Sequence, residues 1–541
     1  MKDRSPPASL VSRDASPTPP KGAMRPQKPL TLRAILAYGR CESLTGGLVC
    51  FSVIFGPWAF GTTEPWSVWV LNSASFLLGL LLLAKMLIRR LAHYQPAAWD
   101  RNHLGEGMSR PDSGMQFPRW IGATLATLTL AILGYCLIAA LNARALYSPA
   151  RMDFTYLSHI EWLPHSYDRD RTLLSTANFL ALALFFWSLR DWLMGKTADE
   201  TRTARPAATA RERGDSVSPV QPRTRIHPGR LRFLLWLLCI NGTLLAVESI
   251  CQKLSGTTKL LWLVQPRINA DPFGPYSYHS NGAQFFNLLW PVALGFWWTL
   301  RREVRYQRSI ADRRRAWRSH LLLPGVLLMA ICPILSSSRA GAAVAIAAIG
   351  LSAVIILLGL KRRHPATRFA ALLFFGATLA TGLLLGWDKL ADRLKDTRNG
   401  YVVREDIYVT AREVARDYPW FGTGPGTFES VFQLYRRSPD EYWPAQLHND
   451  WLETRITFGW VGSALIALAF FCVLARWFVP GEIHGSLQFT ALLWLALAGC
   501  LAHARFDFPF QVYSILQLFL LECAILSVIS KHRGGIATPA T

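Results

Sequence analysis

Residues 341–360 read GAAVAIAAIGLSAVIILLGL, and residues 361–364, which follow, read KRRH. An α-helix needs roughly 20 apolar residues to cross a hydrocarbon core of about 30 Å, and the first stretch meets that length without a single charge. Basic residues directly after it are typical of the cytoplasmic end of a membrane helix. The stretch therefore predicts a transmembrane helix that ends inside the cell.

The same pattern recurs along the whole chain of 541 residues, of which 51% are apolar and only 17% are charged. Apolar blocks alternate with arginine-rich segments, and their lengths predict an all-α polytopic membrane protein with about twelve transmembrane helices. The expected spans are 43–61, 66–88, 119–141, 173–194, 232–251, 281–300, 319–335, 341–360, 369–387, 456–478, 487–505 and 509–530. This composition excludes most classes of soluble protein.

The basic residues are divided unequally between the two sides that these spans define. With both termini inside, the inner loops hold 39 of the 58 Lys and Arg residues, and 19 lie elsewhere. The Lys/Arg bias sets the orientation of membrane proteins, so we expect cytoplasmic termini. Anionic lipid of the inner leaflet accounts for the net charge of +23, and we expect membrane lipids but no nucleic acid as partners.

The loops between the spans suggest how the chain is organised. Residues 1–32 are rich in Pro, Ser and Arg and predict a disordered cytoplasmic tail without a cleavable signal peptide, and 197–229 predict a cytoplasmic linker. On the outer side, 142–172 and 388–455 are long enough to fold, and helical patterns in 388–455 predict a large helical loop between the ninth and tenth spans. The nine cysteines lie within apolar blocks or at their ends and do not predict disulfides.

The stretch His448-Asn449-Asp450-Trp451-Leu452-Glu453 leads into the tenth span. On a continuous helix, His448, Leu452, Arg455, Gly459 and Gly462 would form one stripe, because they are four and three residues apart. The two glycines would then leave a groove for a lipid tail or another helix. A capping histidine above an ordinary glycine packing face is the alternative explanation of the same spacing.

Several arginines are expected at the outer membrane surface. Arg339 lies in Ser336-Ser337-Ser338-Arg339-Ala340-Gly341, between two closely spaced helices. Arg404, Arg412 and Arg416 follow helical spacing in the large outer loop. An arginine fork binds phosphate oxygens at two points, so together these residues could bind a phosphate ester. Snorkelling to lipid phosphate explains Arg339 equally well, and a solvated helix face paired with acidic neighbours would explain the other three.

Other polar residues are expected close to the same surface. His279 and Asn281 precede the sixth span, and His503 and Asp507 follow the eleventh, where they could line a cleft or cap helices. The stretch Gly422-Thr-Gly-Pro-Gly426 predicts a turn, because no Lys-Ser/Thr pair follows it as in a phosphate-binding loop. No outer segment shows metal-ligand spacing, and we expect neither a metal nor another cofactor.

Three segments together resemble the O-antigen ligase and polymerase superfamily. They are Arg404-Glu-Asp-Ile-Tyr, Arg416-Asp-Tyr-Pro-Trp-Phe-Gly-Thr-Gly-Pro-Gly-Thr-Phe428, and His448-Asn449 followed by nine residues and Gly459-x-x-Gly462. Ser338-Arg339-Ala340-Gly341 resembles the family's Ser-Arg-Gly element with Ala in place of the first Gly. His503-Ala-Arg-Phe-Asp507-Phe-Pro resembles a helix-end element of many members. The likeness covers about 330–510, within a transmembrane ligase-like domain of 33–535.

The resemblance implies a metal-independent, inverting membrane glycosyltransferase in the bacterial inner membrane, with its active site facing the periplasm. The donor would be a glycan on undecaprenyl pyrophosphate, and an acceptor hydroxyl would attack its anomeric carbon. His448 would be the general base, and Arg339 and Arg404 would bind the pyrophosphate. The other candidate substrate-binding residues are Arg412, Arg416, Asn449, Arg455, Gly459, Gly462, Asn281, His279, His503 and Asp507.

Several functions share this chemistry. The acceptor would be lipid A-core in an O-antigen ligase, a growing chain in a surface polysaccharide polymerase, or a protein in an O-oligosaccharyltransferase. The spacing from His448 to Gly462 favours the ligase. A polysaccharide transporter is a more distant alternative, because it predicts charged or broken helices in mid-membrane, whereas the polar residues here collect at one surface.

Overall fold

The computed structural model describes residues 32–99, 117–202, 226–266, 271–305, 319–360, 365–395, 397–437, 444–479 and 483–531. Structural statements below concern these residues alone. The expected tail lies outside them except for Leu32, and so does most of the expected linker at 197–229. The nine cysteines are all described, and all are free thiols.

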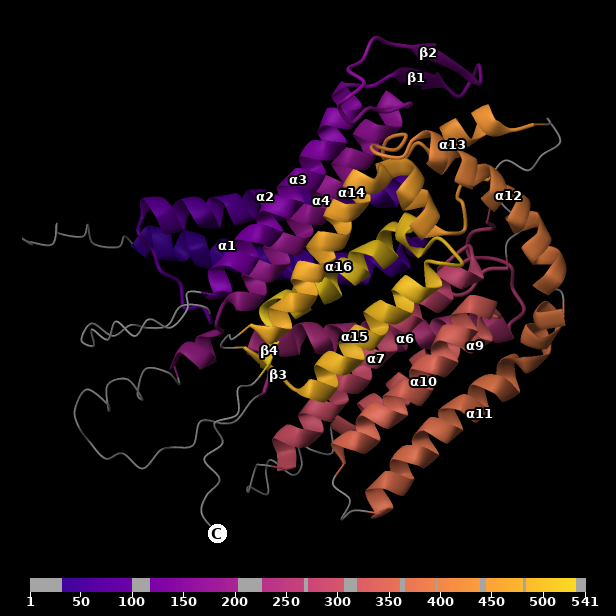
Figure 1. Cartoon of the computed structure of the whole chain (residues 1–541). Coiled ribbons are helices and arrows are strands. Elements are labelled where there is room, and N and C mark those ends of the chain that lie inside the picture. The colour runs from indigo at the N-terminus through magenta and orange to yellow at the C-terminus, as the bar shows by residue number, and fades with distance from the viewer. Residues whose placement is uncertain are drawn as a thin grey trace, which may run out of the picture.

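Each of the twelve expected spans coincides with a helix of the structure (Figure 1). These helices are α1 (Leu32–Trp58), α2 (Pro65–Leu91), α3 (Phe117–Leu141), α4 (Arg169–Met194), α6 (Gly229–Leu254), α7 (His279–Arg305), α9 (Leu322–Leu335), α10 (Arg339–Gly359), α11 (Pro365–Lys395), α14 (Asp450–Ala475), α15 (Leu487–His503) and α16 (Tyr513–Val528). Within the described ranges, eight are long and apolar enough to cross a membrane, and α9, α15 and α16 are shorter apolar helices. The prediction of an all-α polytopic membrane protein is confirmed.

Helix α7 is the centre of the bundle. Every residue from His279 to Leu300 is buried, and α7 packs against α6, α9, α10, α15 and α16. Its first turns carry polar residues and its last turn carries arginines, which explains why it is less apolar than its neighbours. A helix surrounded by protein on all sides can hold polar side chains that lipid would exclude, so α7 is suited to carry part of a site.

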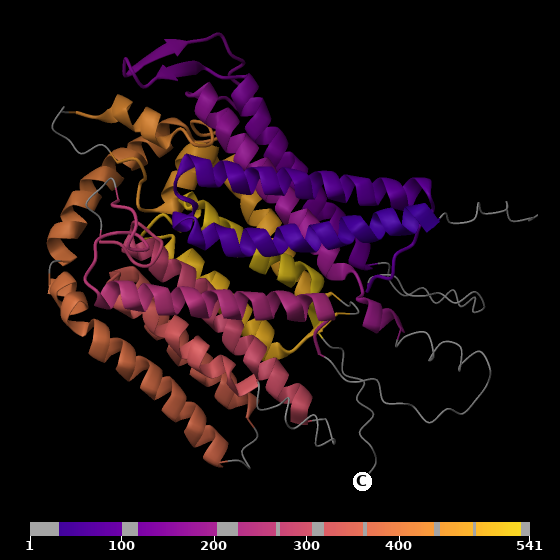
Figure 2. The same ribbon diagram turned by 180° about the vertical axis from the view of Figure 1, so that it is seen from behind.

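The other helices lie on two sides of this centre. Helices α1, α2, α3 and α4 pack together on one side, and α9, α10 and α11 lie on the other (Figure 1). The view from behind shows α1 and α2 crossing the face of the bundle (Figure 2). Two short strands, β3 (His484–Gly485) and β4 (Ser530–Lys531), pair in parallel near the ends of α14 and α16.

One end of the bundle carries a folded cap. It consists of the hairpin β1 (Ala145–Ser148) and β2 (Asp153–Tyr156), helix α12 (Thr397–Asp417) and helix α13 (Phe428–Phe432). In Figure 1 the hairpin and α13 lie beyond the ends of α3 and α14, and α12 runs from the neighbourhood of α13 down the right side to α11. A small apolar core joins these parts, including Phe154, Ile407, Val414 and Phe428. The prediction of a helical segment within 388–455 is therefore confirmed.

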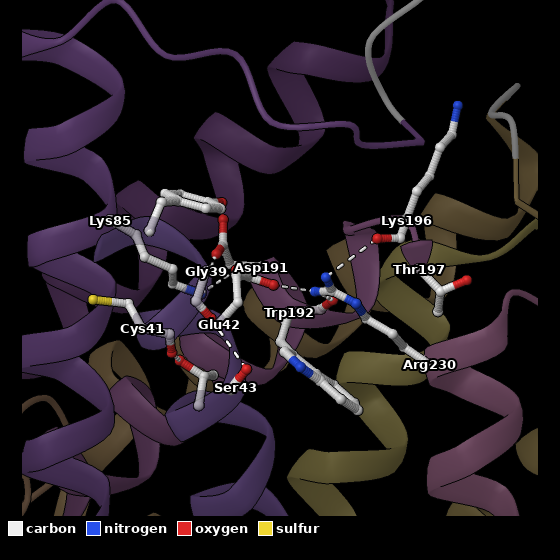
Figure 3. Close-up of polar contacts among 12 residues, drawn as sticks. Gly39, Cys41, Glu42, Ser43, Lys85, Asp191, Trp192, Lys196, Thr197 and Arg230 are labelled. Carbon is white, nitrogen blue, oxygen red and sulfur yellow. Dashed lines mark hydrogen bonds and ion pairs between the residues drawn. The ribbon is translucent and has the colours of Figure 1, made fainter. Parts of the chain in front are cut away.

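The opposite end carries a cluster of half-buried charges from α1, α2, α4 and α6 around the buried Lys85 (Figure 3). The Lys85 Nζ atom is 2.9 Å from Glu42 Oε1 and 2.7 Å from Asp191 Oδ2, and its side chain is fully buried. Arg89 pairs with Asp191 at 2.6 Å, and Arg230 pairs with Glu42. All five residues belong to segments that the charge distribution assigns to the inner side, so these segments do meet at one end of the bundle.

Candidate active site

His448 and Asp507 form a contact where α14 begins and α15 has just ended. The His448 Nδ1 atom is 3.1 Å from Asp507 Oδ1. The two segments are tied by the backbone N–H of Asp450, which donates to the Ala504 carbonyl at 2.8 Å. His448 has φ +56°, and its carbonyl accepts a 2.9 Å hydrogen bond from the Tyr408 hydroxyl of α12. The cap therefore holds the histidine in an unfavourable backbone conformation.

The environment of the pair fixes which imidazole nitrogen of His448 carries a hydrogen. Burial raises the pKa of Asp507, but the hydrogen bond from His448 and the imidazole of His503, whose Nε2 atom is 3.8 Å away, outweigh burial and lower that pKa well below its ordinary value. A carboxylate only accepts hydrogen bonds, so Nδ1 of His448 carries a hydrogen, and whenever the ring is neutral Nε2 holds the lone pair. Phe508 and Tyr278 pack against the ring with centroids 4.7 and 5.9 Å away. This arrangement suits a general base.

Asp507 also reaches the central helix. Its Oδ2 atom accepts a hydrogen bond from the Ser280 hydroxyl, in the first turn of α7. His503 lies beside them, with Nε2 3.0 Å from Ser280 Oγ and Nδ1 2.7 Å from Gln284 Oε1. Ser338, directly before Arg339, is 3.0 Å from Ser280 Oγ. These groups are almost completely buried and join three parts of the chain that are distant in sequence.

Two of the expected arginines lie next to this network. Arg339 is the first residue of α10, and Ser338 caps that helix by accepting the Gly341 N–H at 3.1 Å. Arg404 extends from α12 and donates from its guanidinium to the Phe506 carbonyl at 3.1 Å, one residue before Asp507. Thus the structure brings together His448, Asp507, His503, Arg339 and Arg404, which the sequence placed in separate segments.

The remaining polar candidates have other surroundings. Arg412 and Arg416 are exposed on α12, whereas its buried face packs in the cap. Arg455 donates to the Pro419 carbonyl at 2.8 Å and lies 4.2 Å from the centre of the Trp460 ring. The Asn449 side chain accepts the Leu452 N–H at 3.2 Å and so caps α14. Contacts within the chain therefore explain the positions of the Arg455 and Asn449 side chains.

His279 and Asn281 begin α7, on either side of Ser280, and both are buried. The His279 ring packs edge to face on Tyr278, which also contacts His448. Both residues are therefore close to Ser280 in the chain, and their role in binding substrate stays a prediction.

The predicted continuous stripe from His448 to Gly462 is wrong. His448 precedes the helix in a left-handed conformation, and Gly459 has φ 61° and ψ −166°, which interrupts α14. The segment 419–424 supplies partners at the interruption: the N–H groups of Trp460 and Val461 donate to the carbonyls of Pro419 and Trp420 at 3.0 and 3.1 Å. The expected turn at 422–426 overlaps the end of this segment, with positive φ at Gly422, Gly424 and Gly426.

The predicted groove at the two glycines is also wrong. A Cβ atom at Gly459 would overlap the Trp420 carbonyl, and one at Gly462 would lie 2.9 Å from Phe458 and 3.2 Å from Tyr135. The chain itself fills the space that a lipid tail was expected to occupy. The spacing of the two glycines predicted an open helix face only on the assumption that the helix is unbroken.

Ser280, Gln284, Ser338 and Tyr408 were not among the residues predicted from the sequence. Ser280, Gln284 and Asn287 recur at four and three residues within an apolar segment, which is a signal of a polar face directed into a bundle. Ser338 lies in a serine-rich turn, and the sequence of that turn gives no such signal. Among the described residues, no group of three or more His, Cys, Asp or Glu side chains could hold a metal ion.

Comparison with known proteins bears on the same region. Residues 324–467 match the family model described as O-antigen ligase. This segment is similar to the O-antigen ligase family. It contains Arg339, Arg404 and His448, whereas His279, His503 and Asp507 lie outside the matched residues. No curated protein matches the chain. The match over 324–467 supports the O-antigen ligase and polymerase superfamily, and the apolar helices of the described residues support a multi-pass membrane protein.

Proposed function

We propose that this protein transfers a glycan from undecaprenyl pyrophosphate to an acceptor hydroxyl at the periplasmic face of the bacterial inner membrane. The hydrogen bond from His448 Nδ1 to Asp507, at 3.1 Å, is the observation that carries the proposal. A base of this kind is needed to activate a hydroxyl, and a helix-packing histidine would not need a buried carboxylate behind it.

The reaction would proceed in one displacement. His448 Nε2 accepts the hydroxyl proton as the acceptor oxygen bonds to the anomeric carbon. The bond between that carbon and the pyrophosphate oxygen breaks, and undecaprenyl pyrophosphate leaves with the electron pair. Attack opposite the leaving group inverts the configuration. The pyrophosphate is a stable anion when it leaves, so no separate general acid is required.

Arg339 and Arg404 would bind the pyrophosphate. Arg339 begins α10 directly after Ser338, and Arg404 on α12 donates to the carbonyl of Phe506, the residue before Asp507. Positive groups already in place where negative charge grows are usually the largest source of electrostatic stabilisation of a transition state. In this proposal Arg412 and Arg416, which are exposed, have a secondary role in attracting the donor. No divalent ion takes part, and transfer should proceed in EDTA.

We favour lipid A-core as the acceptor, because the spacing between His448 and Gly462 fits the ligase type. Polymerisation of surface polysaccharide and transfer to a protein hydroxyl use the same chemistry and remain the alternatives. A transporter is less consistent with the structure, because the candidate polar groups gather at one end of the bundle.

The glycan phenotype of a deletion strain tests the proposal and separates these acceptors. A ligase predicts bare lipid A-core together with accumulated lipid-linked polymer. Short chains of one repeat would indicate a polymerase, and an unmodified glycoprotein would indicate an O-oligosaccharyltransferase. Loss of glycan from all three acceptors, with the lipid-linked donor retained on the cytoplasmic side of the membrane, would contradict the proposed enzyme.

A further inference from the structure

The hydrogen bonds beneath Asp507 converge on a single hydroxyl, that of Ser280. It contacts Asp507 Oδ2, His503 Nε2 at 3.0 Å and Ser338 Oγ at 3.0 Å. Ser280 is 2% exposed and belongs to α7, which is buried along its apolar length. A serine hydroxyl has one hydrogen to donate and two lone pairs, so three partners use its full capacity.

The chemistry of the partners sets the direction of each hydrogen bond. Ionised Asp507 can only accept, so the single Ser280 hydrogen goes to its Oδ2 atom. His503 Nε2 and the Ser338 hydroxyl must then donate to Ser280. The other ring nitrogen of His503, Nδ1, lies 2.7 Å from the side-chain amide of Gln284. Asp507 therefore sets the direction of all three hydrogen bonds at Ser280.

That arrangement links the two halves of the proposed reaction. One arm runs from Ser280 through Asp507 to His448, the proposed base. The other runs through Ser338, the N-cap of α10, to the Gly341 N–H in the first turn of that helix, which begins at Arg339, the proposed pyrophosphate ligand. The backbone supports this junction at both ends, because Ser337 and His448 both have positive φ, at 63° and 56°. Non-glycine residues persist in this conformation when their surroundings enforce it.

We propose that Ser280 is a positioning residue, which orients Asp507 and thereby His448 and fixes their place relative to Arg339, with His503 as its second support. This inference rests on the proposed function. Ser280 does not touch substrate in this account. Its loss should misalign the base without removing the binding site for the donor.

The test compares Ser280→Ala with Ser188→Ala in the full chain, reconstituted in lipid nanodiscs. Ser188 is a matched control, because it is a buried serine of membrane helix α4 whose hydroxyl donates to the Leu78 carbonyl at 3.0 Å, away from this network. The reaction contains undecaprenyl pyrophosphate-linked oligosaccharide in excess and lipid A-core, so that ligation and polymerisation both release undecaprenyl pyrophosphate, which is measured.

Ser280→Ala should lower kcat about 10- to 100-fold, the range typical of residues that hold a functional side chain in place, while KM for the donor stays within about twofold. Added to Asp507→Asn, it should cause no further loss, because Ser280 acts through Asp507. His503→Gln, which keeps a donor beside Ser280, should retain more activity than His503→Ala. Independent, multiplicative losses, or a Ser280→Ala enzyme as active as Ser188→Ala, would overturn the inference.

The same experiment separates this inference from the proposed function. If His448→Gln and Asp507→Asn are as active as the unmodified chain, the proposed base is wrong whatever Ser280→Ala does. If both lose transfer and Ser280→Ala matches Ser188→Ala, only the role of Ser280 is wrong. Thermal unfolding of each variant shows whether a loss of activity comes from unfolded protein. If Ser280→Ala is unfolded, the comparison of His503→Gln with His503→Ala tests the role of the network instead, and equal activity of these two variants would overturn the inference.

Discussion

A histidine that accepts a proton at one nitrogen works best when its other nitrogen is held. Asp507 holds Nδ1 of His448, and Phe508 and Tyr278 restrict the ring from its sides. The sequence predicted His448, Arg339 and Arg404 as the reactive residues, and it named Asp507 as a substrate ligand. The contact between Asp507 and His448 depends on how the start of α14 meets the end of α15. The spacing of residues along the chain does not reveal that contact.

At the residue scale, substitution by lysine tests whether the arginines bind pyrophosphate, because it keeps the positive charge and removes the planar guanidinium group. Arg339→Lys and Arg404→Lys should each lose much of the transfer activity, because an ammonium group cannot bind pyrophosphate oxygens with a planar fork. Arg412→Lys, at an exposed position of α12, is the control and should lose little. Initial rates at saturating donor provide the measurement, and near-normal rates for both lysine variants would favour snorkelling to lipid over pyrophosphate binding.

At the scale of elements, α14 shows where reasoning from periodicity stopped. The apolar pattern predicted the helix, and the stretch that begins with His448-Asn449 predicted where the helix starts. Gly459, however, was interpreted as part of one continuous helix face. In the structure it is a break whose freed N–H groups find partners in segment 419–424. That pairing is a tertiary contact between a loop and a helix, and the glycine pattern alone fits an open groove and a closed contact equally well.

Gly459→Ala should therefore destabilise the protein. Alanine is strained at positive φ, and its Cβ would overlap the Trp420 carbonyl, so the loop and the break would both have to move. Gly376→Ala is the control: a Cβ at Gly376 of α11 meets nothing within 4 Å, and alanine is favoured in a helix interior. Thermal unfolding in detergent should show a lower Tm for Gly459→Ala only; equal Tm values would contradict the contact.

The charge cluster that joins α1, α2, α4 and α6 gives a second prediction for elements (Figure 3). Lys85→Met removes the cation shared by Glu42 and Asp191, and breaking a buried ion pair costs about 3–5 kcal/mol. Arg230 and Arg89 still pair with these acids, which sets that range as an upper bound. Lys395→Met removes an exposed pair with Asp392 and should cost under about 1 kcal/mol. Comparable free energies of unfolding for the two variants would refute the prediction.

At the scale of the whole molecule, the sequence predicted the positions of the twelve helices from the length of their apolar segments, although α7 is not among the eight described helices that are long and apolar enough to cross a membrane. The sequence also predicted that the candidate polar residues lie close to one membrane surface. Helix α4 connects the two ends: Thr172 Oγ1 donates to the Pro425 carbonyl in the cap at 3.0 Å, and Asp191 belongs to the charge cluster. At 1.5 Å per residue these ends are roughly 28 Å apart, which is close to the thickness of a bilayer core.

This separation gives a test of orientation. We expect the cap to be periplasmic and the charge cluster cytoplasmic, from the excess of Lys and Arg on the latter side. A cysteine at Trp162, which is 74% exposed beside the cap, should react with a membrane-impermeant maleimide in intact cells. A cysteine at Leu91, 76% exposed at the end of α2, should react only after the inner membrane is opened. The reverse pattern would place the proposed site on the wrong side.

The central claim is that His448 removes a proton from the acceptor during transfer from a polyprenyl pyrophosphate. Its most direct test is the single-turnover transfer rate of the reconstituted full chain with saturating lipid-linked donor, for the unmodified protein, His448→Ala and His448→Gln. Glutamine can form hydrogen bonds but cannot accept a proton at neutral pH, so both variants should bind donor normally and lose about 10²–10⁴-fold in rate. A His448→Gln protein that transfers at the normal rate would contradict the account.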